Sequence, residues 1–160
     1  MNVFTQLQQS VIARLTEVDT TIPLLVPVVG QIAWVTEDKG DFANIIARAT
    51  AQLGIVGIVM TPGGGKLFKV GVFPISFDCP IEIQTQENVT VNRSAAGTQI
   101  PSLDLMQFIM QRLHLWSPTG QRITRIELNE VPYRLVTEHP LLVYNTLLTA
   151  KVTIPAPLTT

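Results

Sequence analysis

The stretch from Phe77 to Trp116 constrains the fold of this chain more than any other part of it. Within the stretch, apolar and polar residues alternate along Ile81–Gln84. A period of two is typical of a β-strand with one buried face and one solvent-facing side. A polar segment, Asn88–Gln99, follows, and Leu103–Trp116 then has the apolar spacing of a helix. The expected unit is therefore a strand, a long polar connection and a helix, to which the rest of the chain is added.

The predicted helix after the polar segment has a recognisable start and two apolar stripes. Ser102 can cap it by accepting a bond from a backbone N–H group, and Asp104 lies in the first turn, where a negative charge suits the helix dipole. A helix that is apolar on two sides is buried on two sides. The second side can be covered by the chain's own strands or by another protomer, and the sequence leaves both open. The first stripe is Leu103, Met106, Ile109 or Met110, and Leu113, and the second is Leu105, Phe108 and Leu115.

Two further helices are predicted nearer the N-terminus. Apolar residues recur at helical spacing in Val3–Val18 and again in Phe42–Leu53. Asp41 can cap the second of these helices, and Gly54 ends it. Between the two helices, Leu24–Val29 is flanked and interrupted by proline, which indicates an extended linker or edge segment.

The remaining apolar segments predict β structure. Ile55–Met60 is typical of a buried strand, and Thr61–Gly65 of a turn that leads to a hairpin partner at Lys66–Val72. The other strand candidates are Gln31–Val35, Ile123–Leu128, Tyr133–Thr137 and Leu142–Ile154, the last of which leaves a helix possible because it contains Leu147 and Leu148.

Length and composition indicate one domain with little surface charge. The 160 residues are expected to form a single domain over 1–154, followed by an extended tail at 155–160. Hydrophobic residues make up 46% and charged residues 14%, against the usual charged fraction of about a quarter. The apolar runs are too short to span a membrane, and the first twenty residues do not resemble a signal peptide. The low charge favours either burial of apolar surface in an oligomer or a surface rich in Thr and Gln.

The charge balance argues against a dedicated nucleic-acid binder. The formal net charge is −1, whereas such proteins usually carry a basic stripe, so at most a weak passing contact with DNA is expected. The arginines at 93, 122, 125 and 134 are interleaved with acidic residues at 127, 130 and 138. This arrangement favours ion pairs or solvated side chains over a phosphate-binding patch.

The motifs that could carry catalysis are weak. Gly63–Lys66 lacks the first glycine and the following Ser or Thr of a phosphate-binding loop, so a turn is expected there. Cys79 has no basic neighbour in sequence and is expected to pack as a thiol. His114 and His139 are isolated from any nucleophile or acid, and no Cys/His cluster resembles a zinc site. We therefore predict no catalytic residue, cofactor or metal.

Residues that could contact another subunit come from three places. The polar segment Asn88–Gln99 is long and flanked by firm elements, which is typical of an interaction loop, and Arg93 could make a charge-assisted bond there. The second apolar stripe could meet a neighbouring protomer, and the apolar Leu158 lies on a Pro-rich tail. The candidates are Asn88, Asn92, Arg93, Leu105, Phe108 and Leu158.

The order of these elements resembles the tail-terminator and tail-completion (neck) proteins of long-tailed bacteriophages. The resemblance covers most of Met1–Ile154 and is carried by the N-terminal helix, the hairpin, the strand Ile81–Glu87 with the excursion Asn88–Arg93, the helix ending in Leu113–Pro118, and the closing strands. It implies an α+β fold, with one mainly antiparallel sheet flanked by about three helices.

The resemblance also implies a role in assembly. Proteins of this family are virion components that form hexameric rings, cap the tail tube, and join it to the head–neck, and they are not enzymes. The implied partners are further copies of the chain, the tail tube protein and a neck or connector protein. The alternatives are another neck or head–tail connector protein or, from a different class, a small cytoplasmic enzyme or ligand-binding domain that uses the Gly63–Gly65 turn.

Overall fold

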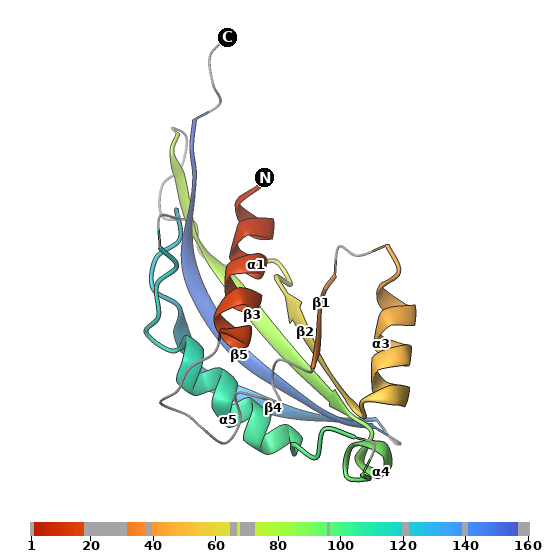
Figure 1. The fold of residues 1–160 in the computed structure, drawn as a ribbon. Helices are drawn as coiled ribbons and strands as arrows, with labels where there is room; N and C mark the ends of the chain where they lie inside the picture. The colour runs from red at the N-terminus through yellow and green to blue at the C-terminus, as the bar shows by residue number, and fades with distance from the viewer. Residues whose placement is uncertain are drawn as a thin grey trace.

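The computed structural model describes residues 2–17, 32–37, 40–64, 67, 73–95, 97–119, 122–138 and 141–156. Its strands form one five-stranded sheet in the order β1-β2-β3-β5-β4, in which only β1 and β2 are parallel (Figure 1). The predicted α+β class with one mainly antiparallel sheet is therefore confirmed. The elements in chain order are α1 (Val3–Thr16), β1 (Ala33–Thr36), α3 (Phe42–Gln52), β2 (Ile55–Met60), β3 (Ile75–Glu87), α4 (Val89–Asn92), α5 (Ser102–Leu113), β4 (Glu127–Glu138) and β5 (Leu141–Ile154).

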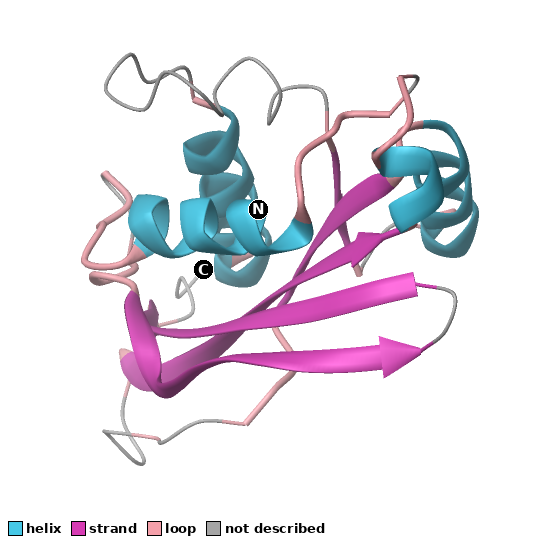
Figure 2. Ribbon diagram, turned by 90° about the horizontal axis from the view of Figure 1, so that it is seen from below, coloured by secondary structure: helices cyan, strands magenta, loops and turns pink. Residues whose placement is uncertain are grey.

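The main core lies between the sheet and the helices α1 and α5, which cover the same face of the sheet (Figure 2). The alternation predicted for β3 holds, since Ile81 and Ile83 are buried in this core while Glu82 and Gln84 point to the opposite face. Burial of apolar surface of this kind is the main force that stabilises the fold. The helices contribute Leu7, Val11, Leu15, Leu105, Phe108, Ile109 and Leu113, and β5 contributes Leu148, Ala150 and Val152.

A smaller core lies on the other face of the sheet, beneath α3. Alternate residues of β2 divide between the two cores, because Ile55 and Val59 pack in the main core while Val56 packs with Val35 and Ala49. The α3 helix connects β1 to the parallel strand β2, as a βαβ crossover requires. It starts and ends where the sequence predicts, between Asp41 and Gly54.

The predicted hairpin after β2 is wrong. β2 pairs with β3, in a register that places Val59 opposite Ile83, and not with Lys66–Val72. Of that segment the structure describes only Leu67, which makes an isolated bridge to Phe77. The alternating pattern of β3 is longer than that of the nearer segment, so it provides more buried side chains for pairing.

The last two strands differ from the sequence prediction in their limits. Ile123–Leu128 and Tyr133–Thr137 were expected as separate strands, but β4 runs continuously over Glu127–Glu138 with a shift of register between Leu128 and Tyr133. Ile123 makes only an isolated bridge to Val152. β5 is a strand throughout and pairs with β3 from Leu142 to Ile154, so the helical alternative for this segment is excluded.

The helix α5 is covered on both sides by its own chain. It lies against α1, β3 and β5, and both apolar stripes contribute buried side chains. Only Leu103 and Leu115, near its two ends, are half exposed. The sequence left open whether the second apolar side of the helix is covered by the chain's own elements or by another protomer. The chain's own elements cover most of it.

Several predictions fall on residues that the structure does not describe. These are the linker Leu24–Val29, His139, Lys66 and the tail beyond Ala156, which contains Leu158. Among the described helices, none combines the length and the hydropathy that a membrane crossing requires.

Candidate subunit-contact site

Glu87 is the centre of the polar segment that the sequence marks as an interaction loop. It is the last residue of β3 and continues the buried side of the alternation, after Ile83 and Thr85. Its side chain is fully buried. A buried carboxylate is costly unless charged or polar partners compensate it, so the segment after β3 has to supply them.

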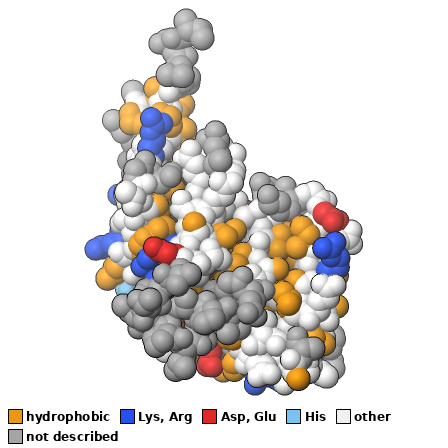
Figure 3. Space-filling view, viewed as in Figure 1, with side chains coloured by type: hydrophobic (Ala, Val, Ile, Leu, Met, Phe, Trp, Pro, Cys, Tyr) orange, Lys and Arg blue, Asp and Glu red, His pale blue; other side chains and the backbone are white. Residues whose placement is uncertain are grey.

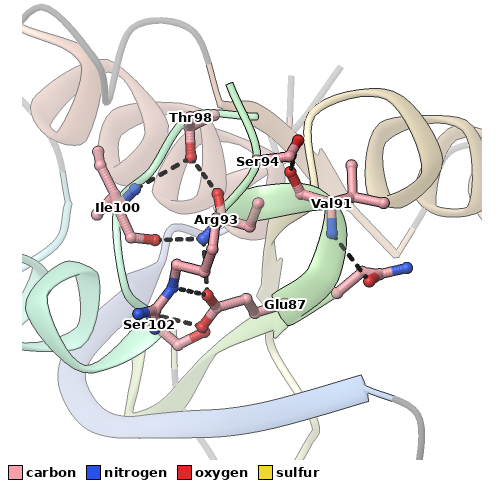
Figure 4. A network of polar contacts seen from close by, with 9 residues as sticks. Glu87, Val91, Arg93, Ser94, Thr98, Ile100 and Ser102 are labelled. Carbon is pink, nitrogen blue, oxygen red and sulfur yellow. Dashed lines mark hydrogen bonds and ion pairs between the residues drawn. The ribbon is translucent and has the colours of Figure 1, made fainter. Parts of the chain in front are cut away.

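Four hydrogen bonds satisfy this carboxylate (Figure 4). Asn92 Nδ2 and Arg93 Nε donate to Oε1 at 2.7 and 2.9 Å. The backbone N–H and the hydroxyl of Ser102 donate to Oε2 at 2.9 and 2.7 Å. Glu87 therefore joins the end of β3, the one-turn helix α4 and the start of α5.

The start of α5 differs from the sequence prediction. Ser102 was expected to cap the helix, but it is the first helical residue, Pro101 stands at the cap position, and no side chain of the cap residue bonds to the helix. The Ser102 hydroxyl donates to Glu87 instead. Asp104 lies in the first turn as predicted, and the carboxylate of Glu87 adds a second negative charge at the helix N-terminus, from a distant point in the sequence.

Asn92 ties the rest of the polar segment together. Its side chain donates to Ile100 O at 2.6 Å and accepts from the hydroxyl of Thr98 at 2.5 Å. Its backbone carbonyl accepts from Gln99 N at 2.9 Å. The segment is further bound to the end of α3, because Asn88 N donates to the carbonyl of Gly54 at 2.8 Å. The loop is thus fixed to its own protomer.

Gly54 makes this approach possible. Its φ of +80° lies in the left-handed region that favours glycine. A Cβ at this position would collide with the backbone of Asn92. The glycine predicted as a helix stop therefore has a second purpose, which is to let α4 lie against the end of α3.

The hydrogen bonds also set the ionisation of Glu87. Burial alone would raise the pKa of its carboxyl group, but the bonds from Arg93, Asn92 and Ser102 outweigh burial and hold the pKa below the usual value for glutamate. The group is therefore ionised when the protein is folded at neutral pH.

The structure places the six predicted contact residues very differently. Asn92, Leu105 and Phe108 are buried inside the protomer, so their side chains have no surface to offer another subunit. Asn88 is half-buried and caps α4, where its Oδ1 accepts from Val91 N at 3.3 Å. Arg93 is 47% exposed, although its Nε is engaged by Glu87. Leu158 lies outside the described residues.

Sequence reasoning missed Glu87 itself, although a signal for it was present. A glutamate at a position that the alternation assigns to the buried face requires partners, and Asn92 and Arg93 follow within six residues.

Other arginines also take part in ion pairs, as the interleaved charges predict. Arg125 Nη2 lies 2.8 Å from Glu127 Oε1. Arg134 pairs across the sheet with Glu82 on β3, at 3.1 Å, rather than with an acidic residue of its own strand region. Glu82 also accepts from Asn145, so polar side chains line the sheet face opposite α1 and α5.

Cys79 and His114, the described residues that the sequence offers as possible catalytic groups, both contact other residues of the fold. Burial, with the nearby charge of Glu37, raises the pKa of the Cys79 thiol to about 11, so the thiol is protonated at neutral pH. His114 Nδ1 accepts a bond from Leu128 N at 3.1 Å. No group of three or more His, Cys, Asp or Glu residues able to hold a metal occurs among the residues that the structure describes.

Three exposed apolar side chains lie on one edge strand of the sheet. Val131, Tyr133 and Leu135 occupy alternate positions of the edge strand β4 and are 64%, 49% and 50% exposed. At the opposite edge of the sheet, the helix α3 contains one charged residue, Arg48. Figure 3 shows hydrophobic side chains on the face that carries α1 and α3, with acidic and basic side chains beside them at the α3 end.

Comparisons with known proteins show a likeness of fold alone. No protein-family model matches the sequence, and no curated protein matches it. The structure is similar to a chain from the virion of a native gene transfer agent (GTA) particle, with a TM-score of 0.57 and 14% sequence identity. The match covers 95% of this chain and 98% of that chain, so the two share one fold from end to end.

Proposed function

We propose that this chain is a virion structural protein that forms the ring ending the tail tube of a phage-like particle. The observation that carries the proposal is the match of fold, over 95% of this chain and 98% of the other, to a component of a gene transfer agent virion. The order of elements that resembles tail-terminator proteins supports the same role.

The mechanism in this proposal is geometric. Copies of the chain form a closed ring, with six copies as the resemblance implies, and one face of the ring stacks on the last ring of the tube protein. The other face differs in shape and chemistry, so further tube subunits cannot add to it. That second face is then available to a neck or connector protein, which joins the tail to the head.

A depletion experiment tests this role. Particles produced without the chain should carry tubes of uncontrolled length that are not joined to heads, and purified chain added back should restore both properties. If tubes keep their normal length but remain unjoined, the chain is a neck or connector protein instead. Normal particles without the chain would contradict both roles.

A further inference from the structure

Two different surfaces lie at opposite edges of the sheet. β4 is the strand at one edge, and α3 packs on β1 and β2 at the other. We propose that α3 of one copy of the chain docks on β4 of the next copy, head to tail. This inference rests on the proposed ring and names the surfaces that would build it.

The β4 surface consists of Val131, Tyr133 and Leu135, and the exposed Glu130 immediately precedes them in the sequence. An edge strand that exposes a row of apolar side chains invites association, and proteins normally avoid such a row. The high β-propensity of such residues explains why they occur in a strand, but it does not explain why they are exposed on an edge strand. Pro132 cannot donate a hydrogen bond, and the register shifts before Tyr133, so the strand is poorly suited to extending the sheet by backbone pairing. A neighbouring copy is therefore expected to contact this edge through side chains rather than through backbone hydrogen bonds.

The α3 surface consists of Ala43, Ala47 and Ala51, with Arg48 beside them. The three alanines are exposed and spaced by four residues, so they form one line along the outside of the helix. The inner side of the same helix carries the larger Phe42, Ile45 and Ile46 that pack in the smaller core. A line of small side chains leaves a flat surface against which projecting side chains, such as those of Tyr133 and Leu135, can pack closely.

The α3 and β4 surfaces carry side chains of opposite charge. Arg48 is exposed on α3, and Glu130 is exposed on β4. Within the described part of the chain, neither has a hydrogen-bond or ion-pair partner. Opposite charges on the two ends favour contact between unlike surfaces, whereas pairing like surfaces would leave both charges without a partner.

Contact between two unlike surfaces has a consequence for assembly. Such a heterologous contact repeats from copy to copy, and it closes into a ring when the rotation between copies permits. Pairing of β4 with β4, or of α3 with α3, would stop at a dimer. The head-to-tail arrangement is therefore the one that agrees with a ring.

Mixing two blocked variants tests the arrangement. Ala47→Glu blocks the α3 surface by bulk and charge, and Leu135→Asp blocks the β4 surface. Each full-length variant alone should be a monomer by light scattering, but an equimolar mixture should form a dimer, because one intact surface of each kind remains. The matched controls are Ala13→Glu on α1 and Leu103→Asp on α5, which are also exposed and should assemble as the wild type does.

The other outcomes each overturn the inference in a different way. If Ala47→Glu still dimerises while Leu135→Asp does not, β4 pairs with itself, and the reverse result means that α3 pairs with itself. If the wild type assembles and neither variant changes it, the ring stands but uses other surfaces. If the wild type is monomeric both alone and with tube ends, the proposed ring itself is wrong.

A charge exchange provides an independent check on the same contact. Arg48→Glu and Glu130→Arg should each weaken association several-fold, and the double variant should recover most of the loss. Melting temperatures measured in parallel confirm that each variant is folded. Equal weakening in the double variant would mean that the two residues do not meet.

Discussion

The carboxylate of Glu87 is the residue-scale feature on which the connection between β3 and α5 depends. Replacing it by Gln keeps the shape but removes the charge, and at least one of the four donors then faces an amide N–H group. We expect Glu87→Gln to lower the free energy of unfolding by about 2–4 kcal/mol. Urea unfolding at neutral pH measures this. The matched control is Glu127→Gln, which breaks an exposed ion pair and should cost less than about 1 kcal/mol.

The same residue predicts how stability depends on pH. Because the pKa of Glu87 is lower in the folded protein than in the unfolded chain, its contribution is present above the unfolded pKa and is lost as the pH falls through the folded pKa. The difference in stability between wild type and Glu87→Gln should therefore shrink as the pH is lowered from about 6 to about 3. A difference that stays constant over this range would mean that the charge of Glu87 contributes nothing.

At the scale of elements, the sequence correctly predicts the helices and strands that depend on a local pattern of apolar residues. The helices α1 and α3 and the strands β2 and β3 follow from apolar periodicity, and Gly54 marks the end of α3 as expected. Strand pairing is not local, since it depends on which distant segment buries the most side chains. This is why β2 was assigned to the nearer segment Lys66–Val72 instead of β3.

The role of the polar segment after β3 as a subunit contact stays a prediction. Its internal bonds were not predicted: Asn92 donates to Glu87 and to the carbonyl of Ile100, while Arg93 and Ser94 are exposed. Polarity in a sequence does not tell whether a side chain meets water, a neighbour or a buried charge. The edge position of β4, which exposes Tyr133 and Leu135, follows only from the order of strands in the folded sheet.

The C-terminal segment gives a prediction for a single element. β5 pairs with β3 as far as Ile154, and the two described residues after it, Pro155 and Ala156, are exposed. We expect deletion of 155–160 to leave the melting temperature within about 2 °C, since Pro155 and Ala156 are exposed and lie beyond the last strand pair. Because the sequence makes Leu158 of this segment a candidate subunit contact, we propose that the deletion weakens assembly.

The control for this deletion is a longer one that begins at Thr153. It removes strand pairs with β3 and the bond between the Ser76 and Thr153 hydroxyls, so it should lower the melting temperature as well. If the protein lacking 155–160 assembles in a complementation assay as well as the full chain, the tail has no role between subunits.

At the scale of the whole molecule, the two edges of the sheet differ in the surfaces that they offer to further copies of the chain. A sheet with an exposed apolar edge at one end and a nearly uncharged helix at the other suits repeated contact between copies. The fold is shared with a chain from the virion of a gene transfer agent particle. We propose that the function is performed by the ring.

The most direct test is to locate the chain in assembled particles by electron microscopy with a tagged copy. We predict one closed ring at the head-proximal end of each tail tube, with α3 of each copy facing β4 of the next. Label distributed along the tube or in the head shell, or particles that lack the chain altogether, would contradict the proposed role.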